Sequence, residues 1–119
     1  MPKLPQYPFA EKFAQWKKDL LKLWADLYKF RDIFKANFEL GKKHYGLGNF
    51  SDAVLRFKFV VWLEPKYAAG WYWLGLSHLA LAQKPAAIKA LKKATEIRPD
   101  WQEAHDALNS AQNSDSKNV

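Results

Sequence analysis

The chain has 119 residues, a length that suits a single domain. Apolar residues make up 49% and charged residues 26%, a globular balance that excludes disorder for all but the ends. There is no Cys, which excludes disulfides and thiolate metal sites and fits a cytoplasmic protein. The net charge is +7, and most of the excess of Lys and Arg lies in the N-terminal half.

Residues 1–8 contain three Pro and are expected to form an irregular N-terminal arm. This arm has no apolar stretch like that of a secretory signal, so we expect no cleaved leader. The longest uncharged stretch, residues 67–83, is shorter than the roughly 18 residues that a membrane span needs.

Residues 9–31 are expected to form an amphipathic helix that ends near Asp32. Lys side chains lie mostly on one side of this helix. Apolar residues recur on the other side at steps of three and four: Phe9, Phe13, Trp16, Leu20, Leu23, Trp24, Leu27, Tyr28 and Phe34. Three roles stay open for this face: covering the end of a repeat array, contacting a second copy or another protein, or lying on an anionic membrane.

The rest of the chain repeats itself with a period of about 34 residues, a length typical of two-helix repeat units. Identical pairs in one gapless register are Leu40 and Leu74, Gly41 and Gly75, His44 and His78, Leu47 and Leu81, Ala53 and Ala87, Lys58 and Lys92, and Pro65 and Pro99. Similar apolar residues recur between them at helical spacing, which predicts two helices and a turn in each unit. The two repeated glycines are expected where paired helices approach closely, and the two prolines where second helices end.

This pattern resembles the tetratricopeptide-repeat family, whose motif is W-x2-L-G-x2-Y, then A-x3-F, then P. The second unit reads Trp71-x2-Leu74-Gly75-x2-His78, then Ala87-x3-Leu91, then Pro99. The first unit departs from the motif at Asn37, and both units have His where the family has Tyr.

The resemblance covers about residues 34–112 and implies an all-α, right-handed superhelix of antiparallel helix pairs. We expect repeats at 34–67 and 68–101, a capping helix at 102–112 and a frayed tail at 113–119. With the N-terminal helix, about six helices are expected.

In the family, the first helices of successive repeats line a concave groove. The resemblance implies that this groove is lined by Lys35, Phe38, Lys42, Tyr45, Tyr72, Trp73, Leu76, Leu79, Glu103 and Asp106. Such a groove is basic and aromatic at one end, apolar in the middle and acidic at the other, which suits a largely apolar peptide or helix with oriented charge. In so short an array, the N-terminal helix is an equally good candidate to cover this groove.

These features predict a non-catalytic protein-interaction module: an adaptor, a co-chaperone-like protein or an assembly scaffold. No phosphate-loop, dinucleotide-binding or nucleophile-elbow motif occurs, so we expect no enzyme and no cofactor. His44, His78 and His105 are the candidate metal ligands. Because the first two occupy equivalent packing positions and no carboxylate cluster joins them, we expect no metal site.

One subclass of the family holds the C-terminal carboxylate of heat-shock chaperones with Lys, Asn, Asn, Lys and Arg. The matching positions here are Phe38, Lys42, Trp73, Glu103 and Ala107, and none agrees. Since Glu103 would repel a carboxylate, we expect no chaperone binding of this type.

Other partners stay open as alternatives. Lys residues mix with aromatic residues in the range 12–45, as on surfaces that bind nucleic acid or anionic membranes. Lys far outnumbers Arg, however, and Arg makes most bidentate phosphate contacts, so nucleic acid is not the expected partner. A membrane surface is the least favoured of the three roles of the N-terminal helix. Self-assembly through the helix at 9–31 is the remaining alternative.

Overall fold

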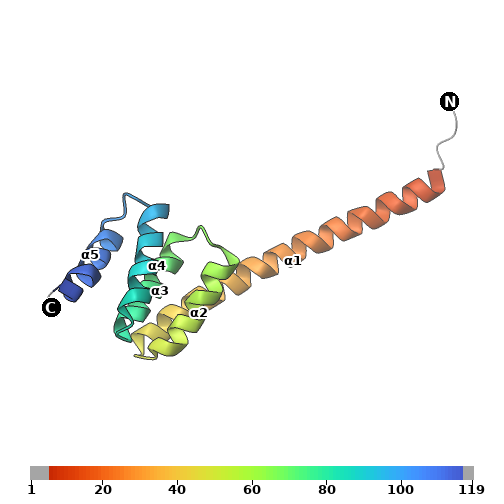
Figure 1. Ribbon diagram of the computed structural model, residues 1–119. Helices are drawn as coiled ribbons and strands as arrows, with labels where there is room; N and C mark the ends of the chain where they lie inside the picture. Colours follow the sequence, from red (N-terminus) through yellow and green to blue (C-terminus); the bar gives the residue numbers. More distant parts are fainter. Residues whose placement is uncertain (1–5, 117–119) are drawn as a thin grey trace. The chain divides into compact units, whose positions relative to one another are not determined.

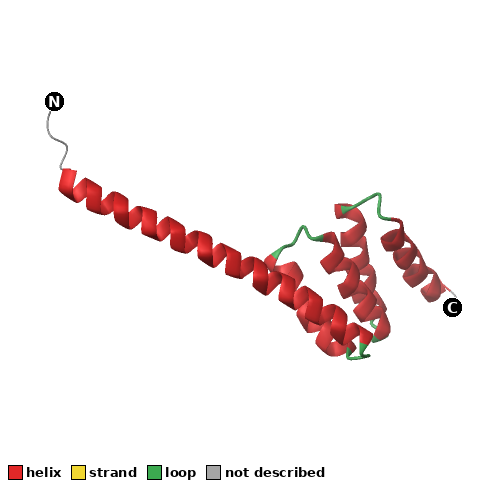
Figure 2. Ribbon diagram, turned by 180° about the vertical axis from the view of Figure 1, so that it is seen from behind, coloured by secondary structure: helices red, strands yellow, loops and turns green. Residues whose placement is uncertain are grey.

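The structure is a computed structural model that describes the backbone of residues 6–116 and the side chains of residues 11, 12 and 14–113. All regular structure in residues 6–116 is helical (Figures 1 and 2). The helices are α1 (Gln6–Gly46), α2 (Phe50–Leu63), α3 (Ala68–Ala80), α4 (Lys84–Ile97) and α5 (Gln102–Ser116). None of the helices described combines the length and apolar character required to cross a bilayer.

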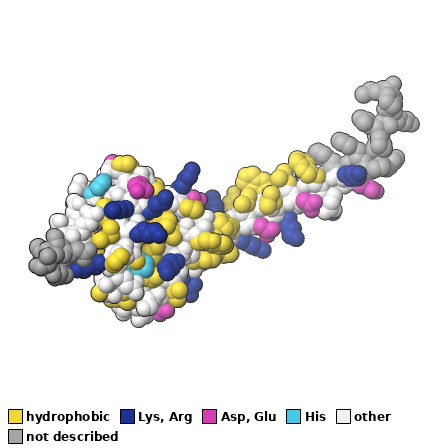
Figure 3. Space-filling model, viewed as in Figure 1, with side chains coloured by type: hydrophobic (Ala, Val, Ile, Leu, Met, Phe, Trp, Pro, Cys, Tyr) yellow, Lys and Arg dark blue, Asp and Glu magenta, His cyan; other side chains and the backbone are white. Residues whose placement is uncertain are grey.

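The chain divides into two units, Met1–Ile33 and Phe34–Val119, called here the first and second unit. In the first unit, every described side chain is exposed. Hydrophobic side chains gather along one edge of this part of α1, and most charged side chains along the opposite edge (Figure 3). The amphipathic pattern expected from the sequence is therefore present on the helix surface.

The predicted break at Asp32 is wrong, because α1 continues without interruption to Gly46. No Pro or Gly lies between Pro8 and Gly41, and one Asp in a helix interior costs at most about 0.7 kcal/mol, too little to end it. Five helices therefore form in the described chain instead of about six.

Both ends of the described chain are more helical than predicted. Residues 6–8 of the expected arm belong to α1, and residues 1–5 lie outside the described residues. The last helix begins at Gln102, as expected, but continues to Ser116. Residues 113–116 of the expected tail are thus helical, and residues 117–119 lie outside the described range.

The period found in the sequence governs the helix starts and the turns. Helix α4 begins one period after α2, at Lys84 against Phe50, and α5 begins one period after α3, at Gln102 against Ala68. The turn before α2 is closed by the Asn49 amide donating to the His44 carbonyl. The turn before α4 is closed by Gln83 donating to His78, and both bonds are 2.8 Å long. The prediction of repeated helix pairs in an all-α fold is confirmed.

The repeated glycines lie where paired helices are in closest contact. A Cβ atom on Gly41 would lie 2.6 Å from Cε1 of Phe57, and one on Gly75 would lie 2.6 Å from Cγ of Leu91. Phe57 and Leu91 occupy equivalent positions in α2 and α4 and are completely buried. Each helix pair thus closes by seating a large side chain of the second helix on a glycine of the first, and the expected close approach at both glycines is confirmed.

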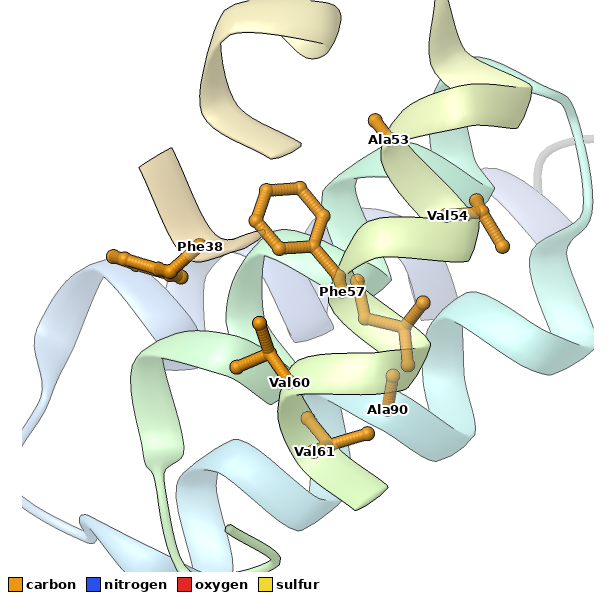
Figure 4. Packing of buried hydrophobic residues seen from close by; sticks show 8 residues of the cluster. Phe38, Ala53, Val54, Phe57, Val60, Val61 and Ala90 are labelled. Carbon is orange, nitrogen blue, oxygen red and sulfur yellow. The ribbon is translucent and has the colours of Figure 1, made fainter. Parts of the chain in front are cut away.

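The hydrophobic core of the second unit lies where the C-terminal part of α1 meets α2, α3 and α4. Figure 4 shows the Phe57 ring reaching from α2 toward the α1 backbone, with Phe38 beside it. The buried cluster comprises Phe38, Ala53, Val54, Phe57, Val60, Val61, Leu74 and Ala90. Helix α3 packs against α2, α4 and α5, and α4 also packs against α5.

Adding a methyl group at Gly75 tests the close approach of α3 to α4. Gly75→Ala should lower the free energy of unfolding by about 1 to 3 kcal/mol, because the new Cβ displaces the buried Leu91 side chain. Urea unfolding followed by circular dichroism measures this loss.

Gly46→Ala is the matched control, since nothing lies within 4 Å of the added Cβ. Its free energy of unfolding should stay close to that of the wild type. Equal effects of Gly46→Ala and Gly75→Ala would contradict the proposed contact.

Candidate protein-binding face

The residues expected to line a groove come from three helices of the second unit. Helix α1 carries Lys35, Phe38, Lys42 and Tyr45; α3 carries Tyr72, Trp73, Leu76 and Leu79; α5 carries Glu103 and Asp106. The surface that these residues contribute is called here the α1/α3/α5 face.

The middle of this face is an aromatic cluster formed by Tyr45, Tyr72 and Trp73. The Trp73 ring meets Tyr45 at a centroid distance of 5.4 Å and Tyr72 at 6.0 Å, in both cases edge to face. Each such contact contributes about 0.5 to 1.5 kcal/mol beyond area burial. All three side chains are only half-buried, so the cluster has surface available to a partner.

Trp73 connects the cluster to the hydrophobic core. Its ring stacks on Phe57 at 6.1 Å with an interplanar angle of 26°. The Ser77 hydroxyl donates to the Trp73 carbonyl at 2.8 Å. The completely buried Phe57 of α2 therefore fixes the position of the partly exposed Trp73 ring.

Phe38 is placed differently from the other aromatic residues of the prediction. It is only 9% exposed and belongs to the core cluster. Tyr67 packs edge-on against it at 5.1 Å, and Phe57 at 5.9 Å. The Lys42 ammonium lies 4.9 Å from its ring centroid. Phe38 thus leaves little surface for a partner.

Leu76 and Leu79 extend the aromatic cluster along α3. They follow Tyr72 at steps of four and three, which places the three side chains on one helix face. Both leucines are half-buried. The α3 part of the face is consequently an apolar row.

Charged side chains flank this row on the other two helices. On α1, Lys35 is exposed, and Lys42 forms an ion pair of 3.3 Å with Glu39. On α5, Glu103 and Asp106 are exposed, and Asp106 accepts a hydrogen bond of 2.8 Å from Gln102. The ion pair is solvent-exposed and contributes little to stability.

The pKa of Tyr72 reflects where the apolar row meets the acidic side. Burial raises this pKa above its ordinary value, the negative charge of Glu103 raises it further, and Tyr45 adds a smaller contribution in the same direction. Residues of α1, α3 and α5 therefore act on one phenol.

Trp101 was absent from the predicted set, although it covers the Tyr72 ring at a centroid distance of 4.5 Å. The Arg98 guanidinium lies 4.7 Å from the Trp101 ring centroid. A signal for this contact existed, because Trp101 follows Tyr67 by one period and Tyr72 follows Phe38 by one period. The Tyr67 to Phe38 contact of one repeat is thus the Trp101 to Tyr72 contact of the next.

Two of the three histidines make local side-chain hydrogen bonds, and the three do not form a metal-binding group in the described part of the chain. The His78 Nδ1 donates to the Gln83 side-chain oxygen at 2.7 Å, and the His105 Nε2 donates to the Pro99 carbonyl at 2.7 Å. The buried Nδ1 of His44 has no hydrogen-bond partner among the described residues. Within that same part of the chain, no group of three or more His, Cys, Asp or Glu residues could hold a metal ion.

No model of a known protein family matches the sequence. Among solved structures, the chain is similar to the first TPR of Spaghetti (RPAP3) bound to the HSP90 peptide SRMEEVD. The identity is 20% and the TM-score 0.66, and the match covers 67% of this chain and 64% of that one. It is also similar to the TPR2AB domain of yeast Sti1 in its pHSP90 complex. Here the identity is 22% and the TM-score 0.71, with 91% of this chain and 42% of that one covered.

The raised pKa of Tyr72 makes stability depend on pH in the alkaline range. The unfolded chain releases the Tyr72 proton near the ordinary pKa of 10.0, while the folded chain retains it to higher pH. The unfolded state then binds fewer protons, so the free energy of unfolding falls as pH rises above about 10. Tyr72→Phe should remove this part of the fall and leave stability near neutral pH unchanged.

Urea unfolding of both proteins at several pH values between about 8 and 11 measures the difference, with each variant compared to itself at pH 8. Tyr28→Phe, which removes a phenol from the exposed first unit, is the matched control for the loss of a hydroxyl group. Identical slopes for all three proteins would show that folding does not perturb Tyr72.

Proposed function

We propose that this chain, which has the tetratricopeptide-repeat fold, is a non-catalytic protein-interaction module. Its partner is a peptide or helical segment of another protein, bound across the α1/α3/α5 face. The observation that carries the proposal is the aromatic cluster of Tyr45, Tyr72 and Trp73, half-buried and continued by the apolar row of α3. Such a surface provides the apolar anchors that dominate binding energy in protein interfaces.

The cluster suits binding because it is already ordered. Trp73 is stacked on Phe57, and Tyr72 is in contact with Trp101. Side chains that are held in place lose little rotamer freedom when a partner docks. The contact energy is then available for affinity.

The charges on either side of the apolar row favour one direction of the bound segment. Lys35 and Lys42 on α1 favour an acidic group, and Glu103 and Asp106 on α5 favour a basic group. Charges at an interface rim mainly affect orientation and association rate. We therefore expect a central apolar stretch with an acidic group on the α1 side and a basic group on the α5 side.

One similar structure is described as bound to an HSP90 peptide and the other as a pHSP90 complex, and we propose a different ligand for this chain. At the positions of the carboxylate clamp it has Phe38, Lys42, Trp73, Glu103 and Ala107. Of these, Phe38 is buried in the core and Glu103 adds negative charge. These features support recognition of an apolar segment rather than of a terminal carboxylate. A protein that binds such a segment can serve as an adaptor or as an assembly scaffold.

Truncating Tyr72 tests the proposed face. Peptides selected from a random display library on the full chain should bind Tyr72→Ala more weakly by about 1 to 3 kcal/mol, or roughly fivefold to 150-fold. Fluorescence anisotropy measures the dissociation constants, after circular dichroism has shown that the variants are equally helical.

Trp62→Ala is the matched control, because Trp62 is an exposed aromatic residue of α2 outside the face. It should bind the selected peptides like the wild type. Loss of binding with Trp62→Ala but not with Tyr72→Ala would move the site to α2 and contradict the proposal.

The peptide SRMEEVD provides a separate test of the ligand class. We expect no binding of it to the wild-type chain, because Glu103 repels the carboxylates and no clamp residue is present. Fluorescence anisotropy with the labelled peptide, free and amidated at its C-terminus, makes the measurement. Binding that disappears on amidation would show a carboxylate-dependent site and overturn this expectation.

A further inference from the structure

The apolar residues of the first unit follow a heptad pattern. From Phe13 the spacing alternates strictly between three and four, through Trp16, Leu20, Leu23, Leu27 and Phe30, and Phe34 at the start of the second unit continues it. The mean spacing is therefore 3.5 residues, which differs from the 3.6 of a straight helix. Sustained over about three heptads, this spacing is typical of a helix that coils around a second helix.

The central residues of this pattern have substantial apolar surface in contact with solvent. The exposed fractions are 37% for Leu20, 55% for Leu23, 49% for Leu27 and 42% for Phe30. Trp24, which follows Leu23, is exposed and widens the stripe on one side. A continuous apolar stripe of this length is unusual on a monomer and indicates a partner.

We propose that a second copy of this chain covers the stripe, forming a parallel two-stranded coiled coil through residues 12–31 of α1. Leu20 and Leu27 then occupy one set of core positions, and Trp16, Leu23 and Phe30 occupy the other. Each helix supplies the same stripe to the other. A two-fold symmetric pair buries both stripes at once, which is the commonest form of homo-oligomer.

The charges beside the stripe support a parallel pair. Asp26 immediately precedes Leu27, and Arg31 immediately follows Phe30. In a parallel coiled coil, Asp26 of one helix faces Arg31 of the other, and symmetry creates this pair twice. Within a single helix the two residues are five positions apart and do not face each other. An antiparallel pair would instead place acidic positions opposite acidic ones.

One like-charge pair opposes this arrangement. Lys12 and Lys17, at the beginning of the pattern, are also five positions apart and lie beside the stripe as Asp26 and Arg31 do. In a parallel pair, Lys12 of one helix would therefore face Lys17 of the other. Both are exposed, where salt screens the repulsion. The apolar stripe and the two Asp26 to Arg31 pairs outweigh it.

Sedimentation velocity of the full chain tests the association. The wild type should sediment at twice the chain mass of 13.8 kDa, while Leu20→Gln with Leu27→Gln should sediment as a single chain. Gln is a good helix former, so the helix itself should persist in circular dichroism. The control is Lys22→Gln with Lys29→Gln, on the charged side of the same helix, which should remain paired.

A wild type at the single-chain mass at about 100 μM, well above most specific dissociation constants, would overturn the proposal. So would a Leu20→Gln, Leu27→Gln variant that pairs like the wild type. A single-chain wild type that floats with phosphatidylglycerol vesicles would assign the stripe to a membrane instead. A single-chain wild type whose melting temperature falls with these two substitutions would assign it to contacts within the chain.

Charge exchange tests the parallel orientation. Asp26→Arg alone and Arg31→Asp alone each place like charges opposite one another and should raise the dimer dissociation constant severalfold. The double exchange should restore it, since opposite charges again face across the pair. Failure of the double exchange to restore pairing would overturn the parallel arrangement.

Discussion

The seating of a large side chain on a glycine determines the geometry of the second unit. With Phe57 against Gly41 and Leu91 against Gly75, paired helices approach more closely than any other residue at these positions would permit. The consequence reaches the surface, because Trp73 stacks on Phe57 and Tyr45 packs against Trp73. The position of the aromatic cluster therefore depends on a contact between α1 and α2 in the core.

The two repeats share this backbone arrangement but differ in the residues of the turn between their paired helices. At the same position of the first turn in each repeat, Gly48 has a φ of 81° and Ala82 a φ of 59°. The left-handed region costs a residue with a Cβ about 1 to 2 kcal/mol, so the second repeat carries strain that the first avoids. Conversely, His78 is satisfied by Gln83, whereas Asn49, one methylene shorter at the equivalent position, makes no such bond to His44 among the described residues. The first repeat thus leaves a buried ring nitrogen of His44 without a hydrogen bond, and the second holds Ala82 in a strained backbone conformation.

The sequence predicted features that recur with the period and missed those that depend on one particular neighbour. Helix starts and the roles of Gly41 and Gly75 follow from spacing and residue size, which are visible in a single chain. The burial of Phe38 depends on Tyr67, which comes from the connection before α3. Helix α1 continues through Asp32 because a single Asp lowers helix propensity only slightly and no Pro or Gly stands beside it to end the helix. The use of the α1/α3/α5 face as a binding site stays a prediction.

The two proposed contact surfaces gain their binding energy in different ways, and mutations can remove one contact without the other. The aromatic cluster belongs to the second unit and is already supported by the core, so it should offer affinity without folding on binding. The heptad stripe belongs to the first unit and gains its packing from an identical stripe. A dimer would carry two copies of the α1/α3/α5 face, and a partner with two recognition segments would then bind with avidity whenever both can be reached together. Weak contacts at each face would in that case suffice for a stable assembly, which is the behaviour required of a scaffold.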